Sequence, residues 1–327
     1  MDVNLDFDTV QTATASNHIS LFWFFVILAS LVGLVYFCFI QFFKYLNSSR
    51  LVTHTPHSKL RSAAQGFVKV KGIVNALFDD ALLKSPLTQT PCCWYRYTIE
   101  KEIHMRDEKG NDTTEWEIVD QGQSSDLFHL KDETGECVIF PVEADVTTTA
   151  HKKWYQFGLI SNELNPSNGL LEKLGSLISK TQRYRYEEHC LEPGQETIVL
   201  GFFRSCDATE DPISNYKKET HALSGEKAAK IKKKYPHLSF GGLNFLDQLT
   251  QTCDDISGQW KRFSEQKSTI NLISSDQLEN RPFIISDLDL KKLVAHYRWY
   301  VFGFGAGFIV SGVIAIVLIA LKLAGKV

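Results

Sequence analysis

Two uncharged apolar runs determine what this 327-residue chain can fold into. Residues 21–43 and residues 299–321 each cover 23 positions and contain no Asp, Glu, Lys or Arg. At 1.5 Å of rise per residue, a helix of that length crosses a hydrocarbon core of roughly 30 Å. We therefore predict an α+β membrane protein in which a β-rich soluble domain lies between two transmembrane helices.

A cleavable signal peptide is the main alternative for the first run. The flank that precedes it holds Asp2, Asp6 and Asp8 and no Lys or Arg. The run is also longer than the roughly 7–15 apolar residues of a signal peptide, and no A-x-A cleavage site follows it. The sequence therefore predicts an uncleaved span, preceded by a short extracytoplasmic segment at residues 1–20.

Basic residues near the two runs predict the orientation. Seven lie between the runs and close to them: Lys44, Arg50, Lys59, Arg61, Lys291, Lys292 and Arg298. On the other side there are two, Lys322 and Lys326. Because Lys and Arg are enriched in cytoplasmic segments, we expect the large middle domain to be cytoplasmic and both ends of the chain to be outside.

The middle of the chain has strand patterns from residue 60 to residue 285. Apolar and polar residues alternate at 66–74 and 94–101, which is the period of a half-buried strand. Turn residues inside 126–141 predict a hairpin, and the Pro193-Gly194 turn predicts a second hairpin between 183–191 and 196–204. Further short strands are expected at 115–119, 269–273 and 283–285.

Helical patterns are fewer in this domain. Apolar spacing predicts a short helix at 170–178, and residues 286–298 read as a helix that leads directly into the second span. Residues 207–268 form a polar insertion, rich in Lys between Lys217 and Lys234, that we expect to be a solvated helix or loop. Attraction of these Lys residues to anionic lipid is the alternative for this segment.

The chain shows no recognisable catalytic, cofactor or metal motif. It has no C-x-x-C, H-x-x-x-H, G-x-S-x-G or Walker A pattern, and seven irregularly spaced Cys. Cys92-Cys93 and the run Glu187-Glu188-His189-Cys190 hold reactive side-chain types, but neighbours on a strand point to opposite faces. We therefore predict structural roles for them and no cofactor. The net charge of −3 argues against nucleic acid as a partner.

A ridge of small residues runs along the second span. Gly303, Gly307, Ser311 and Ala315 recur every four positions, so they lie on one face of a helix. Small residues let membrane helices approach closely, and the expected partner is either the first span or a second copy of the chain. Ordinary tolerance of Gly in membrane helices is the alternative.

Four sequence segments carry a family resemblance. They are RSAAQGFVKVKGIV (61–74), LKSPLTQTPCCWYRYTIEKE (83–102), DLFHLKDETGECVIFPVEADV (126–146) and RYRYEEHCLEPGQETIVLGF (183–202). In this order, before a helix and a closing span, they resemble the GIDE domain. That domain belongs to the family of membrane-anchored ubiquitin ligases of the MULAN or MAPL type, which has bacterial relatives. The resemblance covers most of residues 60–325.

The resemblance implies a domain held beside the membrane by two flanking helices. In the eukaryotic ligases this domain engages partners or substrates, while a separate C-terminal RING finger recruits the ubiquitin-loaded enzyme. A RING needs eight Cys and His ligands for two zinc ions, and this sequence has no such cluster. We therefore expect a RING-less, bacterial-type member to which no catalytic residue carries over.

Three functions follow as hypotheses. The first is an interaction or scaffold module at the membrane surface, in contact with the bilayer, another membrane protein or a second copy of itself. The second is an enzyme: an E3 ubiquitin-protein transferase, disfavoured by the missing zinc ligands, or a hydrolase using Cys190 or His189. The third is a lipid-surface sensor that uses the Lys-rich part of residues 207–268.

Overall fold

The computed structural model describes residues 21–78, 82–106, 112–158, 182–207, 209–221, 245–275 and 281–324. Residues 1–20, the helix expected at 170–178 and the Lys-rich stretch around 227–234 lie outside this description. The chain divides into two compact units. The first comprises Met1–Thr53 with Val294–Val327, and the second comprises His54–Leu293.

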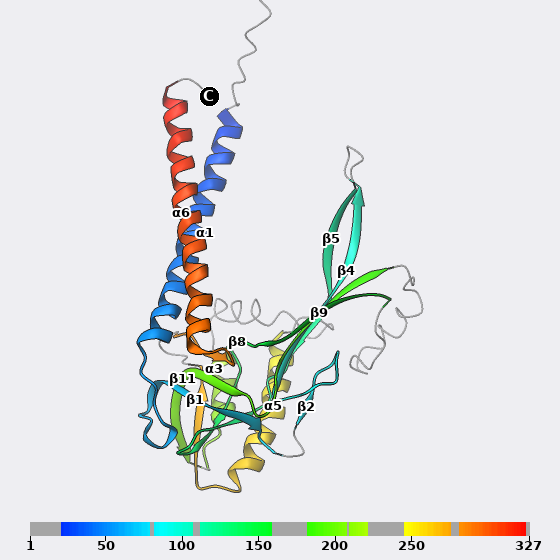
Figure 1. The fold of residues 1–327 in the computed structure, drawn as a ribbon, viewed down its shortest axis with the longest axis vertical. Coiled ribbons are helices and arrows are strands. Elements are labelled where there is room, and N and C mark those ends of the chain that lie inside the picture. Colours follow the sequence, from blue (N-terminus) through cyan, green and yellow to red (C-terminus); the bar gives the residue numbers. More distant parts are fainter. Residues whose placement is uncertain are drawn as a thin grey trace, which may run out of the picture. The chain divides into compact units, whose positions relative to one another are not determined.

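Two long helices make up the described part of the first unit. The helices α1 (Leu21–His54) and α6 (Leu290–Leu323) each contain one of the predicted apolar runs and lie side by side, antiparallel (Figure 1). Both are long and apolar enough to cross a membrane, and only 11% of the most apolar window of each is buried inside the protein. A core helix of a soluble domain would be mostly buried. The α+β architecture with two candidate spans is thus as predicted.

The helix α6 begins at Leu290 and not at residue 286 as expected. Ser286 still belongs to the strand β13 (Ile284–Ser286), and its hydroxyl accepts a hydrogen bond from the backbone N–H of Leu288 at 3.1 Å. The first turn of the helix closes when the N–H of Leu293 donates to the carbonyl of Asp289. From Leu290 the helix continues without a break into the apolar run.

Five strands of the second unit close into a barrel. In spatial order they are β1 (Gly66–Ala76), β6 (Phe128–Lys131), β7 (Glu136–Ile139), β12 (Thr269–Ser274) and β11 (Glu196–Asp207). The long strand β11 pairs with β12 and returns to β1, which completes the ring. The strands β13 and β8 (Asp145–Thr147) extend the sheet from β11. Closure leaves the ring without a free edge.

The barrel interior is apolar and tightly filled. Its buried side chains include Val70, Leu130, Ile139, Val199, Phe203, Ile273 and Ile285. Gly201 is placed where strands pack so closely that a Cβ atom would lie 2.7 Å from Ile273 Cγ2 and 2.8 Å from the ring of Phe283. Such distances are below van der Waals contact, so this position requires glycine.

Two helices from residues 207–268 pack on the barrel. They are α3 (Pro212–His221) and α5 (Phe245–Ser264), and they form a second apolar cluster with the sheet. Its helical members are Ile213, Tyr216, Cys253, Ile256, Trp260 and Phe263. The helical spacing of Cys253, Ile256, Trp260 and Phe263 creates an apolar stripe. The expectation of helix in this segment is confirmed at α3 and α5, but their apolar faces pack on the sheet and are not solvated.

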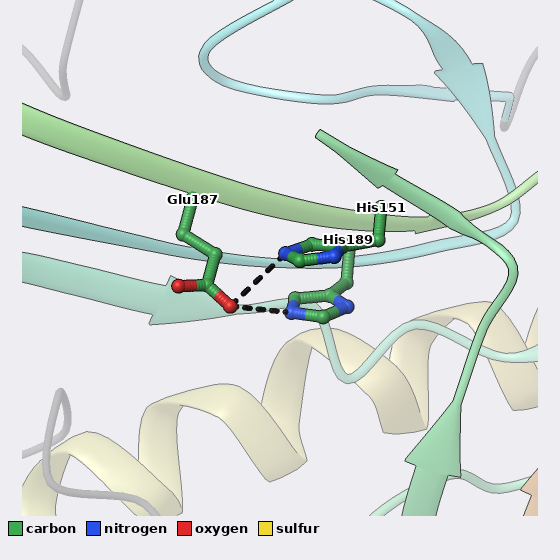
Figure 2. Close-up of side chains that lie close together, drawn as sticks. All are labelled: His151, Glu187 and His189. Atoms are coloured by element: carbon green, nitrogen blue, oxygen red, sulfur yellow. Dashed lines mark hydrogen bonds and ion pairs between the residues drawn. The ribbon is translucent and has the colours of Figure 1, made fainter. Parts of the chain in front are cut away.

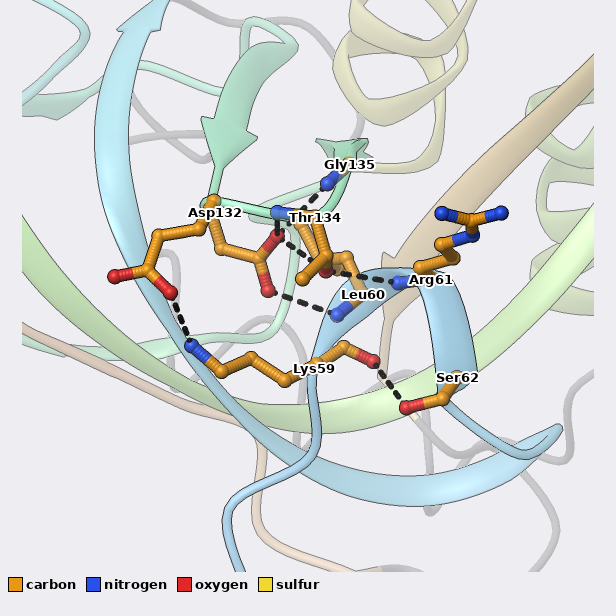
Figure 3. Close-up of polar contacts among 8 residues, drawn as sticks. Lys59, Leu60, Arg61, Ser62, Asp132, Thr134 and Gly135 are labelled. Carbon is orange, nitrogen blue, oxygen red and sulfur yellow. Dashed lines mark hydrogen bonds and ion pairs between the residues drawn. The ribbon is translucent and has the colours of Figure 1, made fainter.

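The turn between β6 and β7 holds the start of the second unit in place (Figure 3). Asp132 accepts hydrogen bonds from the backbone N–H groups of Leu60, Thr134 and Gly135 at 2.8, 2.6 and 2.8 Å. Leu60 begins the short helix η2 (Leu60–Ser62) and is buried. One carboxylate thus orders its own turn and anchors a segment 72 residues earlier in the chain.

A second, four-stranded sheet lies apart from the ring. Its order is β5 (Asp112–Gln123), β4 (Trp94–Arg106), β10 (Arg183–Leu191) and β9 (Ala150–Phe157), all antiparallel. Its small core contains Leu87, Ile99, Tyr184 and Tyr186. A separate pair, β2 (Leu83–Lys84) and β3 (Pro91–Cys92), completes the described strands.

One predicted hairpin is present and the other is wrong. The strands β6 and β7 pair as expected within residues 126–141. The strands β10 and β11 do not pair, because the Pro193-Gly194 turn carries the chain from the four-stranded sheet to the barrel. Gly194 adopts a φ of +83° there and donates its N–H to the carbonyl of Val74 on β1. A turn signal alone does not show which strands it joins.

Candidate functional site

A group of polar side chains lies on one face of the four-stranded sheet. His151 of β9 and His189 of β10 are directly paired across the two strands, and Glu187 lies two residues before His189 on β10. Because alternate residues of a strand share a face, all three side chains project from the same side of the sheet. Figure 2 shows them converging.

The carboxylate of Glu187 connects the two histidines. Its Oε1 lies 3.0 Å from His151 Nε2 and 3.3 Å from His189 Nε2. The two imidazole rings stack with centroids 4.2 Å apart and planes 8° from parallel. His151 is exposed, whereas Glu187 and His189 are half-buried, so the group is open to solvent on the β9 side.

Burial and neighbouring charges shift the titration of this group. Burial lowers the pKa of His189, the positive charges of His151 and Arg96 act in the same direction, and Glu187 opposes them. Burial disfavours the charged form of Glu187, but contacts with His189, Lys153 and His151 outweigh it and lower the pKa of this carboxyl. At neutral pH the site therefore combines an ionised carboxylate with a neutral His189.

Two further cations border the group. The Nζ of Lys153 lies 3.4 Å from Glu187 Oε2. Arg96 of β4 is paired across the strands with His189 and donates to the carbonyl of Val146 at 2.9 Å. The guanidinium is thus fixed by the backbone, whereas the side chain of Lys153 is 40% exposed and can turn toward water.

Glu188 points the other way and has a structural role. It is buried, and it accepts hydrogen bonds from Ser85 Oγ at 3.1 Å, from the Leu87 N–H at 2.9 Å and from Thr88 Oγ1 at 2.5 Å. The carboxylate therefore holds the loop between β2 and β3 beneath the sheet. Buried charge is tolerated here because its oxygens are satisfied by donors.

Cysteine chemistry is shielded from solvent. All seven cysteines are free and buried, including the vicinal Cys92 and Cys93. Cys92 hydrogen-bonds to Cys190, which raises the pKa of the Cys92 thiol and lowers that of Cys190. A nucleophilic thiol must be accessible as well as ionised, and Cys190 is 5% exposed. The hydrolase hypothesis therefore gains no support from Cys190.

The small-residue ridge of the second span lies partly against α1. A Cβ atom at Gly307 would meet Cys38 Sγ at 3.4 Å, and Ser311 and Ala315 are buried. A Cβ atom at Gly303 would meet nothing within 4 Å. Aromatic contacts supplement this ridge, because Tyr45 stacks on Tyr300 with ring centroids 4.9 Å apart.

Residues 100–220 match the GIDE family model, which is described as an E3 ubiquitin ligase. The matched segment begins in β4 and ends in α3, and it contains the whole of β9 and β10. It therefore includes His151, Glu187 and His189. The match confirms the GIDE resemblance seen in the sequence. No curated protein and no solved structure gave a significant match.

Sequence reasoning found part of this site and missed the rest. Glu187, His189 and Cys190 stood out as adjacent reactive residues, and the structure places Cys190 on the face opposite His189. His151 was missed because β9 was not predicted as a strand. The sequence of this segment, HKK followed by WYQF, has no alternation of apolar and polar residues that would predict a half-buried strand.

Proposed function

We propose that this chain is a membrane-anchored interaction domain of the GIDE type, and that its four-stranded sheet receives an extended segment of a partner protein along β9. The description of the matched family, E3 ubiquitin ligase, supports a function related to ubiquitin ligases. The role of the domain would be to hold a partner or substrate close to the membrane. The exposed edge of β9 is the observation that carries this proposal.

The strand β9 has the properties of an unfinished sheet edge. Among the described residues it pairs only with β10. The His151 N–H donates to the carbonyl of Thr149 at 2.9 Å, and the N–H and C=O groups of the rest of the outer edge have no backbone partner in the part of the chain that the structure describes. Its side chains are mostly exposed on both faces, and Phe157 is 67% exposed. Natural proteins blunt or cover such edges, because they are templates for another strand. Strand addition uses these groups for affinity.

The side chains of β9 indicate the partner's chemistry. His151, Lys152 and Lys153 make the first half basic, and Tyr155 and Phe157 make the second half aromatic. A complementary strand would run antiparallel or parallel with acidic residues beside the lysines and apolar residues beside the rings. We therefore propose an extended segment with one acidic end and one apolar end as the occupant.

The two apolar helices supply the anchor in this proposal. The excess of Lys and Arg beside the spans supports a cytoplasmic location for the second unit. Gly307, Ser311 and Ala315 would act in packing α6 on α1, which keeps the anchor as one helical pair. Gly303 is left available for a second copy of the chain.

A ubiquitin transferase acting through its own cysteine is the less favoured function. Such an enzyme needs a reactive thiol that a ubiquitin-loaded enzyme can reach, and all seven cysteines are buried. Zinc-dependent recruitment would need a Cys and His cluster that these 327 residues do not contain. The domain would contribute to ubiquitin transfer by binding.

Site-specific photocrosslinking of the full chain in native membranes tests the proposal. A photoreactive amino acid at Gln156 of β9 should capture a protein segment, whereas the same group at Thr114 of β5 should not. On addition of the captured segment as a synthetic peptide, amide hydrogens of β9 should become protected from exchange. Phe157→Lys should abolish both results, because it replaces the exposed ring that the apolar end of the segment would contact with a charged side chain.

Met105→Lys is the matched control, since Met105 is a 47% exposed apolar residue of β4 in the same sheet. Capture that survives Phe157→Lys, or protection that appears in the barrel and not in β9, would show that the partner binds elsewhere. Equal capture from Gln156 and Thr114 would remove the special role of β9.

A further inference from the structure

We propose that His151, Glu187 and His189 form a binding site for a divalent first-row transition-metal ion, of which Zn²⁺ is the representative. The site would take two imidazole nitrogens and one carboxylate oxygen from the protein. This inference stands on the geometry of three side chains and does not depend on the proposed protein partner.

The sheet brings the three ligands to one point. His151 and His189 face each other across β9 and β10, and Glu187 is on the same face at a spacing of two. Their ligand atoms all lie within 4.8 Å of one another, and no other group of three such residues does so among those the structure describes. A rigid antiparallel ladder fixes the backbone of all three, which reduces the ordering that a bound ion would require.

Two of the three separations between ligand atoms lie within a few tenths of an ångström of what a small ion requires. Four-coordinate zinc with ligands at about 2.0–2.2 Å requires ligand atoms about 3.4 Å apart. The two nitrogen-to-oxygen separations are 3.0 and 3.3 Å. The Glu187 oxygen that now accepts from both histidines would move outward by a few tenths of an ångström. The stacked rings would tilt so that both Nε2 atoms point at the ion.

The three protein ligands indicate which metal ions the site would bind and whether solvent would reach the bound ion. Imidazole suits Zn²⁺, Co²⁺, Ni²⁺ and Cu²⁺, whereas Mg²⁺ and Ca²⁺ prefer oxygen ligands alone. Three protein ligands leave a fourth position of a tetrahedral ion for water or another donor. The exposed side of His151 leaves that position open to solvent.

Nearby cations predict the direction in which a substitution should change the metal affinity. Lys153 competes for Glu187 by its ion pair at 3.4 Å, and Arg96 adds positive charge beside His189. Both disfavour a bound cation, so removal of the mobile one should strengthen metal binding. A cluster that serves only as a hydrogen-bonded group would show no gain in metal affinity with Lys153→Gln.

Titration of the metal-free full chain with Zn²⁺ tests the site. The chain is held in lipid nanodiscs and carries a purification tag without histidine, and heat of binding and Co²⁺ absorption are both recorded. We expect one ion per chain and a Co²⁺ spectrum of four-coordinate type. His151→Ala, His189→Ala and Glu187→Gln should each weaken binding by at least roughly tenfold, since even outer-shell changes have effects of 10–100-fold.

His104→Ala is the matched control, because His104 is an exposed histidine of β4 in the same sheet, and this variant should bind as the parent does. Glu187→Gln keeps the shape of the side chain, and amide exchange of β10 establishes that the sheet is intact. Lys153→Gln should tighten binding several-fold. The site is refuted if no stoichiometric binding occurs, if binding survives His151→Ala, or if His104→Ala weakens binding equally.

Discussion

The barrel and the four-stranded sheet of the second unit differ in how their edges and apolar side chains are covered. The barrel closes on itself, buries an apolar interior and has additional cover from α3 and α5. Within the described residues, the four-stranded sheet has two outer strands that pair on one side only, a small core, and polar groups on its open face. The barrel therefore supplies stability, and the sheet is free to carry side chains that serve binding.

Removal of one aromatic ring from each region should give the largest contrast. Phe128 is 1% exposed in the barrel core, and Phe128→Ala should lower the free energy of unfolding by about 3–5 kcal/mol. Phe157→Ala at the edge of the sheet should change it by less than about 0.5 kcal/mol. Chemical denaturation of the full chain in detergent, followed by tryptophan fluorescence, measures both. Similar losses would contradict the division of roles.

Glu188→Ala tests whether the hydrogen bonds between Glu188 and the β2–β3 loop stabilise the sheet, whose apolar core is small. The substitution leaves the buried Leu87 N–H without its acceptor, whereas the hydroxyls of Ser85 and Thr88 still have hydroxyl partners within 3.0 Å. An unpaired buried donor costs about 1–3 kcal/mol, so we expect a loss of that size by the same denaturation assay. Glu117→Ala is the control, since Glu117 forms an exposed ion pair with Lys101 in the same sheet. A loss of stability no greater than that of the control would show that the loop between β2 and β3 keeps its conformation without Glu188.

Asp211 should make the helical cover of the barrel sensitive to acid. Burial disfavours its ionised form, but hydrogen bonds from Ser214, Ser257 and the Ile213 N–H outweigh burial and lower its pKa. A carboxyl with a lowered folded-state pKa stabilises the fold above its unfolded pKa, and that contribution is lost as pH falls through the folded value. Asp211→Ala should therefore cost about 1 kcal/mol at pH 7, as for a lost helix cap, and less in acid.

Unfolding measured across a pH series gives this difference. Asp254→Ala is the control, because Asp254 is 61% exposed and pairs only at the surface with Lys217. A gap between parent and Asp211→Ala that stays constant down to acidic pH would show that Asp211 acts through packing and not through its charge.

Trp116→Ala should lower the free energy of unfolding by less than Phe128→Ala and Glu188→Ala do. Its ring lies 4.6 Å from the guanidinium of Arg185 and packs on the ring of Tyr155. The side chain of this β5 residue therefore contacts both β10 and β9. Trp116 and Arg185 are both half-buried, and a cation–π contact that solvent still reaches contributes about 0.5–1 kcal/mol. Thr114→Ala, at the same edge, should be neutral. Exchange of β9 amides is the more sensitive readout, and unchanged exchange would show that these rings do not couple the strands.

The sequence predicted the features that depend on local pattern. Hydrophobic runs of 23 residues specify candidate membrane helices without reference to the rest of the fold, and the turn at 132–135 specifies the β6–β7 hairpin. The Pro193-Gly194 turn misled, because whether β10 and β11 pair depends on β1, β4 and β9, which are distant in the sequence. Strand pairing is a long-range property that a turn signal does not contain.

The candidate site depends on the same long-range information. His189 was visible beside Glu187, but its partner His151 is 38 residues earlier in a strand whose side chains are mostly exposed. A strand with no buried face has no alternating pattern to detect. The packing of α3 and α5 on the barrel was not predicted for a related reason, because few apolar residues among many polar ones are enough to pack one face.

The burial of every cysteine has a practical consequence for work on this protein. Native chains should react slowly with maleimides, so a single cysteine introduced on the surface would be the one position that takes a spin label or fluorophore. Distances between two such labels, one beside a span and one on the open sheet, could then be measured without first deleting the natural thiols. Labelling of the natural thiols themselves would report unfolding.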